Sequence, residues 1–247
     1  RMILTIAVRE LRRLFLSPLA WTLLAATQGL LAWIFVLLVQ DFRELQGRLA
    51  GLENAPGVTD LIAAPLFRVA AWGLLLLTPL LTMRLFSEER RARTLDLLLS
   101  APMGTATIVF GKYLGVVLFL WIVVGLAALM PLALAAGATL DFGKLIAGIL
   151  GLGLLAASFA AAGLYLSTLT AQPAAAAAAT FGLLLGLWIA DAQETPGKLL
   201  GYLSPLRHYN ALLLGLFDSA DVAYYFLFGA VFLGLAIRRL DDLRLRG

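Results

Sequence analysis

Apolar residues occur along the chain in long runs that are separated by short polar segments. The runs cover residues 18–40, 65–86, 106–136, 144–168, 173–190 and 222–237. A helix needs about 20 apolar residues to cross roughly 30 Å of hydrocarbon, and only the last run is rather short. No run shows the ten-residue alternation of a membrane β-barrel strand. The pattern therefore predicts an all-α integral membrane protein with six transmembrane helices in a single transmembrane domain, 1–247.

Residues 1–17 precede the first predicted span and repeat apolar residues at helical spacing, with Arg9, Arg12 and Arg13 to one side. A basic amphipathic helix of this kind lies in the headgroup plane of a membrane. Pro18 suits the first turn of the span that follows. The segment is predicted to be an interfacial helix, and both a plain basic flank and a mechanical element fit it.

Residues 191–221 are too apolar for a simple loop, and Pro205 divides them into two pieces too short to span. They are predicted to form a re-entrant pair of helices on the external side. The pair carries a polar cluster of Arg207, His208 and Tyr209. A lone histidine is more often a hydrogen-bonded structural residue than a ligand, so the cluster is only a minor candidate site.

Small residues recur along the fourth predicted span at Gly153, Ala157 and Ala161. Such a ridge lets helices approach closely in lipid. Helix packing within the chain explains it more simply than a subunit interface or the wall of a conduit, although all three fit the spacing.

Charge sets the expected orientation of these elements. The chain has 247 residues, is 62% hydrophobic and is only 14% charged. If the N-terminus is cytoplasmic, most of the 19 basic residues fall on the cytoplasmic side and most of the 15 acidic ones fall outside. Both termini and segment 87–104 are therefore predicted to be cytoplasmic.

Segment 87–104 lies in the stretch FSEERRARTLDLLLSAP and is unusually charged for so apolar a chain. It is predicted to form one helix over 88–100 that starts after Ser87 and ends before Pro102. One face of that helix would be apolar, and the opposite face would carry Glu89 and Arg93. The charged face suits either a soluble partner or a membrane-anchoring loop.

Several kinds of chemistry are missing from the sequence. GKYLG at 111–115 lacks the remainder of a P-loop, and neither GxSxG nor HExxH occurs. There is no cysteine and only one histidine, so no metal site and no catalytic residue is predicted. The span interiors lack the charges that mark proton or ion relays. A chain that moves something without an energy source of its own must take work from a partner.

Several motifs resemble one family of membrane proteins. FSEERRARTLDLLLSAP followed by GKYLG resembles the signature of ABC-2-type export permeases, whose members often have glycine at the position of Arg93. PLF at 65–67, STLT at 167–170 and SPLRHYNALLLGLFDSADVAYYF at 204–226 resemble the gliding-motility (GldF-like) subgroup. They are more distantly similar to the permease of nitrous-oxide-reductase maturation. The likeness covers essentially the whole chain.

The resemblance implies a non-catalytic permease of a bacterial inner-membrane exporter, in which two permease copies form a homodimer on two cytoplasmic ATPase subunits. ATP and Mg²⁺ would bind to the ATPases, and this chain would hold no cofactor. An auxiliary membrane-anchored protein with an extracytoplasmic domain would be a further partner, and no nucleic acid is expected. Segment 87–104 would be a coupling helix. The residues implied to contact the ATPase are Glu88, Glu89, Arg90, Arg91, Arg93, Thr94, Asp96, Leu169, Thr170 and Gln172.

Two other functions fit the sequence. ATP hydrolysis could act on the auxiliary protein, so that the chain transmits force as a scaffold rather than transporting a solute. A membrane enzyme acting on lipid or peptide would need a convergent set of polar groups at one depth, and the cluster around His208 is the one outward set that offers them.

Overall fold

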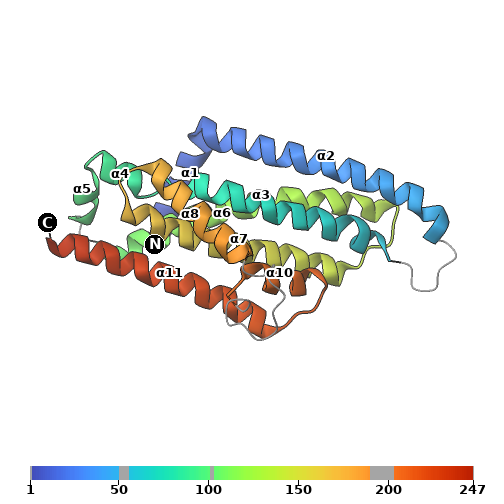
Figure 1. Cartoon of the computed structure of the whole chain (residues 1–247). Helices are drawn as coiled ribbons and strands as arrows, with labels where there is room; N and C mark the ends of the chain where they lie inside the picture. The colour runs from blue at the N-terminus through green and yellow to red at the C-terminus, as the bar shows by residue number, and fades with distance from the viewer. Residues whose placement is uncertain (1, 50–55, 101–102, 190–202, 247) are drawn as a thin grey trace.

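The computed structural model describes residues 2–49, 56–100, 103–189 and 203–246. Within these ranges the ordered elements are helices, and the long ones lie side by side in an elongated bundle (Figure 1). One end of the bundle carries the short helices that follow α3, and the other end carries α10 (Pro205–Leu213). These are called the α4 end and the α10 end below.

Five helices are long and apolar enough to cross a membrane. They are α2 (Pro18–Leu49), α3 (Ala64–Thr82, entered through the π-turn Thr59–Ala63), α6 (Thr105–Leu132, continued by the 3-10 turn Ala133–Ala136), α7 (Phe142–Leu169) and α11 (Ser219–Arg246). A sixth apolar helix, α8 (Pro173–Ile189), has 17 residues, which makes it about 25 Å long. The expected all-helical membrane architecture is thus confirmed, with five helices of full span length and one shorter apolar helix.

Helix α7 lies at the centre of the bundle and contacts α3, α6, α8, α10 and α11. Its small residues let these neighbours approach closely. A side chain at Gly153 would collide with Trp121 of α6, and one at Gly163 would collide with Thr82 of α3. The Ala157 carbonyl accepts a hydrogen bond of 3.2 Å from the Tyr113 hydroxyl, and Ala161 is fully buried. Gly153, Ala157 and Ala161 all make contacts within the chain.

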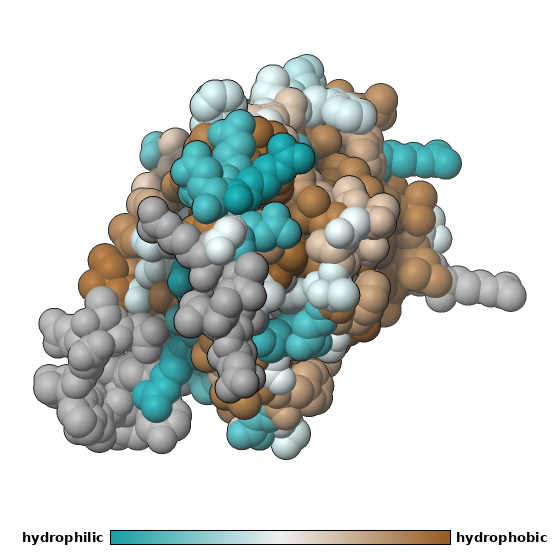
Figure 2. Space-filling view, turned by 90° about the vertical axis from the view of Figure 1, so that its right-hand side faces the viewer, coloured by the Kyte–Doolittle hydropathy of each residue, from teal (hydrophilic) through white to brown (hydrophobic). Residues whose placement is uncertain are grey.

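Helix α2, by contrast, lies at the edge of the bundle and projects beyond the other helices at the α10 end (Figure 1). It leaves large apolar side chains exposed along its length, among them Trp21, Leu30 and Trp33. Figure 2 views the molecule from the α10 end and shows hydrophilic side chains gathered there, with apolar side chains around the flanks. This distribution is the one expected for a bundle whose flanks face lipid.

The N-terminal helix α1 (Met2–Leu16) docks on α6 at the α4 end. Two glycines of α6 make this approach possible. A Cβ atom at Gly111 would lie 2.6 Å from Ile6, and one at Gly115 would lie 2.9 Å from the Ala7 carbonyl oxygen. Ala7 is accordingly buried, together with Glu10. Helix α1 is therefore a packed part of the bundle and more than a basic flank.

The Gly115→Ala substitution is expected to loosen α1. The added methyl group meets backbone, which cannot rotate away, so α1 must shift at a cost of about 1–3 kcal/mol. The thermal midpoint of the purified protein and proteolysis of its N-terminal helix would report the loss. Gly125→Ala on the same helix is the matched control, because nothing lies within 4 Å of its Cβ position, and it should raise the midpoint slightly.

Candidate functional site

The charged segment after α3 forms two short helices in place of the single helix expected over 88–100. Helix α4 covers Ser87–Arg91 and α5 covers Leu95–Leu99. Between them the Thr94 amide donates to the Glu89 carbonyl at 2.9 Å, and the Arg93 amide donates to the Arg90 carbonyl at 3.2 Å. These two bonds form a Schellman motif, which places the residue after the helix in the left-handed region.

Arg93 occupies that left-handed position with φ of 54°, and no other non-glycine residue in the described ranges has a positive φ. A left-handed conformation costs an L-residue with a side chain roughly 1–2 kcal/mol, whereas glycine adopts it freely. The glycine that often stands here in the resembling permeases therefore has a conformational reason. The break also means that Glu89 and Arg93 do not share the face of one continuous helix, as the sequence predicts.

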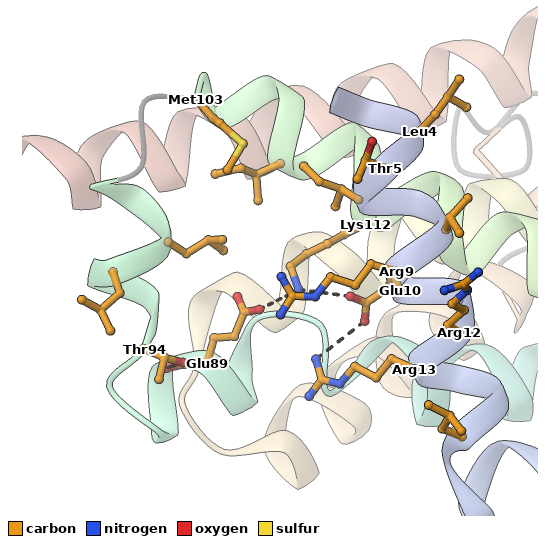
Figure 3. Close-up of a pocket in the computed structure, with 16 residues that line it drawn as sticks. Leu4, Thr5, Arg9, Glu10, Arg12, Arg13, Glu89, Thr94, Met103 and Lys112 are labelled. Carbon is orange, nitrogen blue, oxygen red and sulfur yellow. Dashed lines mark hydrogen bonds and ion pairs between the residues drawn. The ribbon is translucent and has the colours of Figure 1, made fainter. Parts of the chain in front are cut away.

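Glu89 binds Lys112 instead. The Lys112 ammonium lies 2.8 Å from Glu89 Oε1 and 3.5 Å from Glu10 Oε2 (Figure 3). Its side chain is only 5% exposed, and it passes over the Phe86 ring. One buried cation thus joins α1, α4 and α6.

Glu88 makes a second set of ion pairs at the rim of this cluster. Arg13 lies 2.6 Å from Glu88 Oε2, and Arg84 lies 3.3 Å from Glu88 Oε1. These side chains are a third to a half exposed, so each pair contributes little stability. These ion pairs contribute mainly to positioning, because they hold α4 against α1 and against the residues that follow α3.

Arg90 ties the same helix to the central helix of the bundle. Its guanidinium donates a hydrogen bond of 2.8 Å to the Thr168 carbonyl, in the last turn of α7. A cation at a helix C-terminus is favoured by the helix dipole. The α7–α8 turn, which holds the predicted contacts Leu169, Thr170 and Gln172, therefore lies beside α4. Leu169 and Gln172 are exposed there, and Thr170 accepts a hydrogen bond from the Gln172 amide.

The residues implied to contact an ATPase thus divide into two groups. Glu88, Glu89 and Arg90 bind groups of their own chain. Arg91, Arg93 and Thr94 are exposed, and so is Leu97, which is 72% exposed. Asp96 lies on α5, between the exposed groups.

A cleft of about 1130 Å³ separates α1 from α5 at this end (Figure 3). Arg9 and Arg12 line its α1 side, and Leu97 and Met103 line the opposite side. The Glu10, Glu89 and Lys112 cluster also lies along it. The cleft combines basic and apolar side chains, which is a surface suited to a protein segment of mixed character.

The polar cluster at the α10 end has a structural role instead. The Tyr209 hydroxyl is buried and donates to the Phe67 carbonyl at 2.9 Å, which fastens α10 to α3. Burial raises the pKa of Tyr209 well above its usual value, so the donor stays protonated. His208 lies 2.6 Å from Asp221 and stacks on Tyr224, while Arg207 is exposed. Tyr209 and His208 thus bind different groups, the Phe67 carbonyl and the Asp221 carboxylate. The other predicted external helix, before 203, lies outside the described residues.

Sequence reasoning missed Lys112 and Glu10 as members of the site, although both left a signal. Glu10 interrupts the apolar face of an otherwise basic helix, at the position where Ala7 and Leu14 point inward. Lys112 stands between apolar residues just inside α6. Each of these charged residues is unexpected among apolar neighbours, and the ion pair between Glu10 and Lys112 explains both positions.

The fold and this site together define a multi-pass membrane protein with a charged, ordered region at one end. In agreement with this class, residues 74–241 match the family model described as ABC-2 family transporter protein, and the chain belongs to that family. No curated protein matches the chain. Members of the family are transmembrane permease components of ABC transporters that work with an ATPase subunit. In the described residues no three or more histidine or acidic side chains gather as a metal site would require.

Lys112→Met is expected to cost about 3 kcal/mol of stability, because it leaves Glu89 without a cation and leaves Glu10 with only Arg13, 3.8 Å away. Lys144→Met is the matched control. Its Asp60 partner is 2.7 Å away, but both side chains are over a third exposed, so the loss of stability should be small. Adding Glu10→Gln and Glu89→Gln to Lys112→Met should restore most of the thermal midpoint. Equal losses of stability in Lys112→Met and Lys144→Met would contradict a buried ion cluster at Lys112.

Arg93→Gly is expected to stabilise the α4–α5 turn by about 1 kcal/mol, because it removes the left-handed strain. Arg91→Gly, at an ordinary helical position, should destabilise the same turn by a similar amount. Hydrogen exchange of the amides of 89–94 would show slower exchange in the first variant and faster exchange in the second. Faster exchange in both would mean that the Arg93 side chain, rather than its backbone, holds the turn.

Proposed function

We propose that this chain is the permease subunit of an ATP-driven exporter of the bacterial inner membrane, close to the gliding-motility subgroup, with both termini in the cytoplasm. In this assignment α8 serves as a fifth span and α11 as the sixth. The α4 end faces the cytoplasm, where two ATPase subunits dock. The single observation that carries the proposal is the exposed surface of Arg91, Arg93, Thr94 and Leu97 around the α4–α5 turn, on a base that Lys112 joins to α1 and α6.

Force applied to this turn has a defined path into the membrane. Glu89 and Lys112 connect α4 to α6, and Arg90 connects α4 to α7. Because α7 packs against most of the other helices, a displacement of α4 reaches the centre of the bundle through two polar contacts. The cleft beside α1 gives the ATPase a second surface, so α1 and α5 would be engaged together.

A second copy of the chain would cover the apolar flank formed by α2, α3 and α8. Trp72 and Leu76 of α3 are each about half exposed, and Ile189 of α8 is similarly open. The rings of Trp72 and Trp188 pack against each other between α3 and α8, with 4.7 Å between their centroids and a tilt of 53°. A homodimer joined through these helices would leave both α4 ends free for ATPases.

The force-transmitting scaffold has one observation in its favour. Helix α2 runs past the ends of its neighbours, and its last described side chains are mostly polar and exposed. An auxiliary protein with an extracytoplasmic domain would find a rigid projecting helix there. Substrate uptake into vesicles that contain only the permease and its ATPase would exclude this alternative.

Leu97→Glu and Arg91→Glu are expected to weaken binding of the ATPase subunit about tenfold or more, because both alter the exposed turn without touching the ion cluster. Copurification and stimulated ATP hydrolysis would measure the effect. Arg43→Glu, exposed near the far end of α2, is the matched control and should change neither. Unaltered assembly in the Leu97 and Arg91 variants would refute docking at this turn. Variants at Glu88 or Glu89 are unsuitable for this test, because they would also break ion pairs within the chain.

A further inference from the structure

A groove on the lipid-facing side of the bundle is separate from the α4 end. It runs between α6 and α11 over the surface of α7 and has a volume of about 470 Å³. Its walls are apolar, with Phe110 and Leu114 on one side and Leu233 and Ile237 on the other. At Gly229 and Gly234 of α11 nothing lies within 4 Å of the position a Cβ atom would take.

The polar groups in the groove are already satisfied. The Tyr113 hydroxyl donates to the Ala157 carbonyl, and the Ser158 hydroxyl donates to the Tyr225 carbonyl at 3.4 Å. Neither hydroxyl proton is left for a ligand. A groove of this kind takes an apolar occupant and rejects one with unpaired polar groups.

The dimensions of the groove select among apolar occupants. The α11 residues that line it run from Tyr225 to Ile237, which is a length of roughly 18 Å. A volume of 470 Å³ over that length gives a mean width of about 6 Å. A helix with its side chains is about 10 Å wide, whereas carbon chains pack at about 4 Å. The groove therefore fits a hydrocarbon chain along its length, whereas a transmembrane helix would enter it only with its side chains.

A positive charge stands at one end of the groove. Ala230, Gly234 and Arg238 follow each other at intervals of four and so share one face of α11. Arg238 is the first charged residue after the apolar run 222–237, it is exposed, and it forms no ion pair with the described residues. Of the acids that follow, Asp241 accepts a hydrogen bond from Thr105 at 2.6 Å, and Asp242 lies one turn further from the groove.

We propose that this groove binds a phospholipid with an anionic headgroup, with one acyl chain over Gly234 and the phosphate beside Arg238. The apolar walls hold the chain, and the arginine sets the preference for a negative headgroup. On the orientation proposed above the lipid belongs to the cytoplasmic leaflet, where anionic lipids attract basic residues.

The test is native mass spectrometry of the full-length permease in detergent, with phosphatidylglycerol or phosphatidylcholine of identical acyl chains as probes. Wild type is expected to bind phosphatidylglycerol about fivefold more tightly. Gly234→Leu puts a side chain into the groove, where nothing lies within 4 Å of the Cβ position, and should abolish retention of both lipids. Arg238→Gln should retain both and lose the preference. Gly182→Leu, which is open on α8, and Arg43→Gln are the matched controls and should behave as wild type.

Lipid retention by Gly234→Leu equal to that of wild type would overturn the proposal, and an unchanged preference in Arg238→Gln would overturn its headgroup half. A helix of another protein is tested directly, because the chain has no cysteine. A photoreactive probe on Gly234→Cys in native membranes should give adducts of lipid mass, and an adduct to protein would refute the lipid assignment. None of these measurements needs the ATPase, so they stand or fall separately from the proposed function.

Discussion

Lys112 can lie buried at the base of α6 only because two carboxylates reach it from other helices. An unpaired ammonium in such a place costs several kcal/mol, so the positions of α1 and α4 are not independent of each other. Glu10 fixes one and Glu89 fixes the other, at 3.5 and 2.8 Å. The exposed turn, the basic cleft and the link to α7 all take their geometry from this arrangement. Without it α4 and α5 would be a charged loop on a membrane surface.

The same turn geometry occurs twice in the chain with different residues. Helix α10 ends in a Schellman motif in which Gly215 is left-handed with φ of 80°. Helix α4 ends in the same motif with Arg93 in that place. Glycine marks such a stop in a sequence, whereas arginine is read as a good helix former. The sequence therefore predicts one helix over 88–100. In the structure the helix ends at Arg91, because the Thr94 and Arg93 amides bond to the Glu89 and Arg90 carbonyls and close the Schellman turn.

The helical membrane architecture could be predicted because long apolar runs have few other uses in a protein. The placement of α1 could not, since amphipathic spacing is the same for a helix on lipid and for a helix on α6. What distinguishes them is the pair of glycines at 111 and 115, whose role depends on a neighbour about a hundred residues away. The site was half predicted for a similar reason. The charged segment stood out, but only the fold shows that Glu88 and Glu89 turn inward while Arg91 and Leu97 stay outside.

The docking of α1 on α6 also has a consequence for biosynthesis. Helix α1 leaves the ribosome before α6, and the glycines it packs on, Gly111 and Gly115, are made roughly a hundred residues later, which is about 5–20 s of translation. Until then Ala7 and Glu10 are not covered by α6, and an amphipathic helix such as α1 is expected to lie in the membrane interface. Helix α1 is thus made well before the surface of α6 on which it packs.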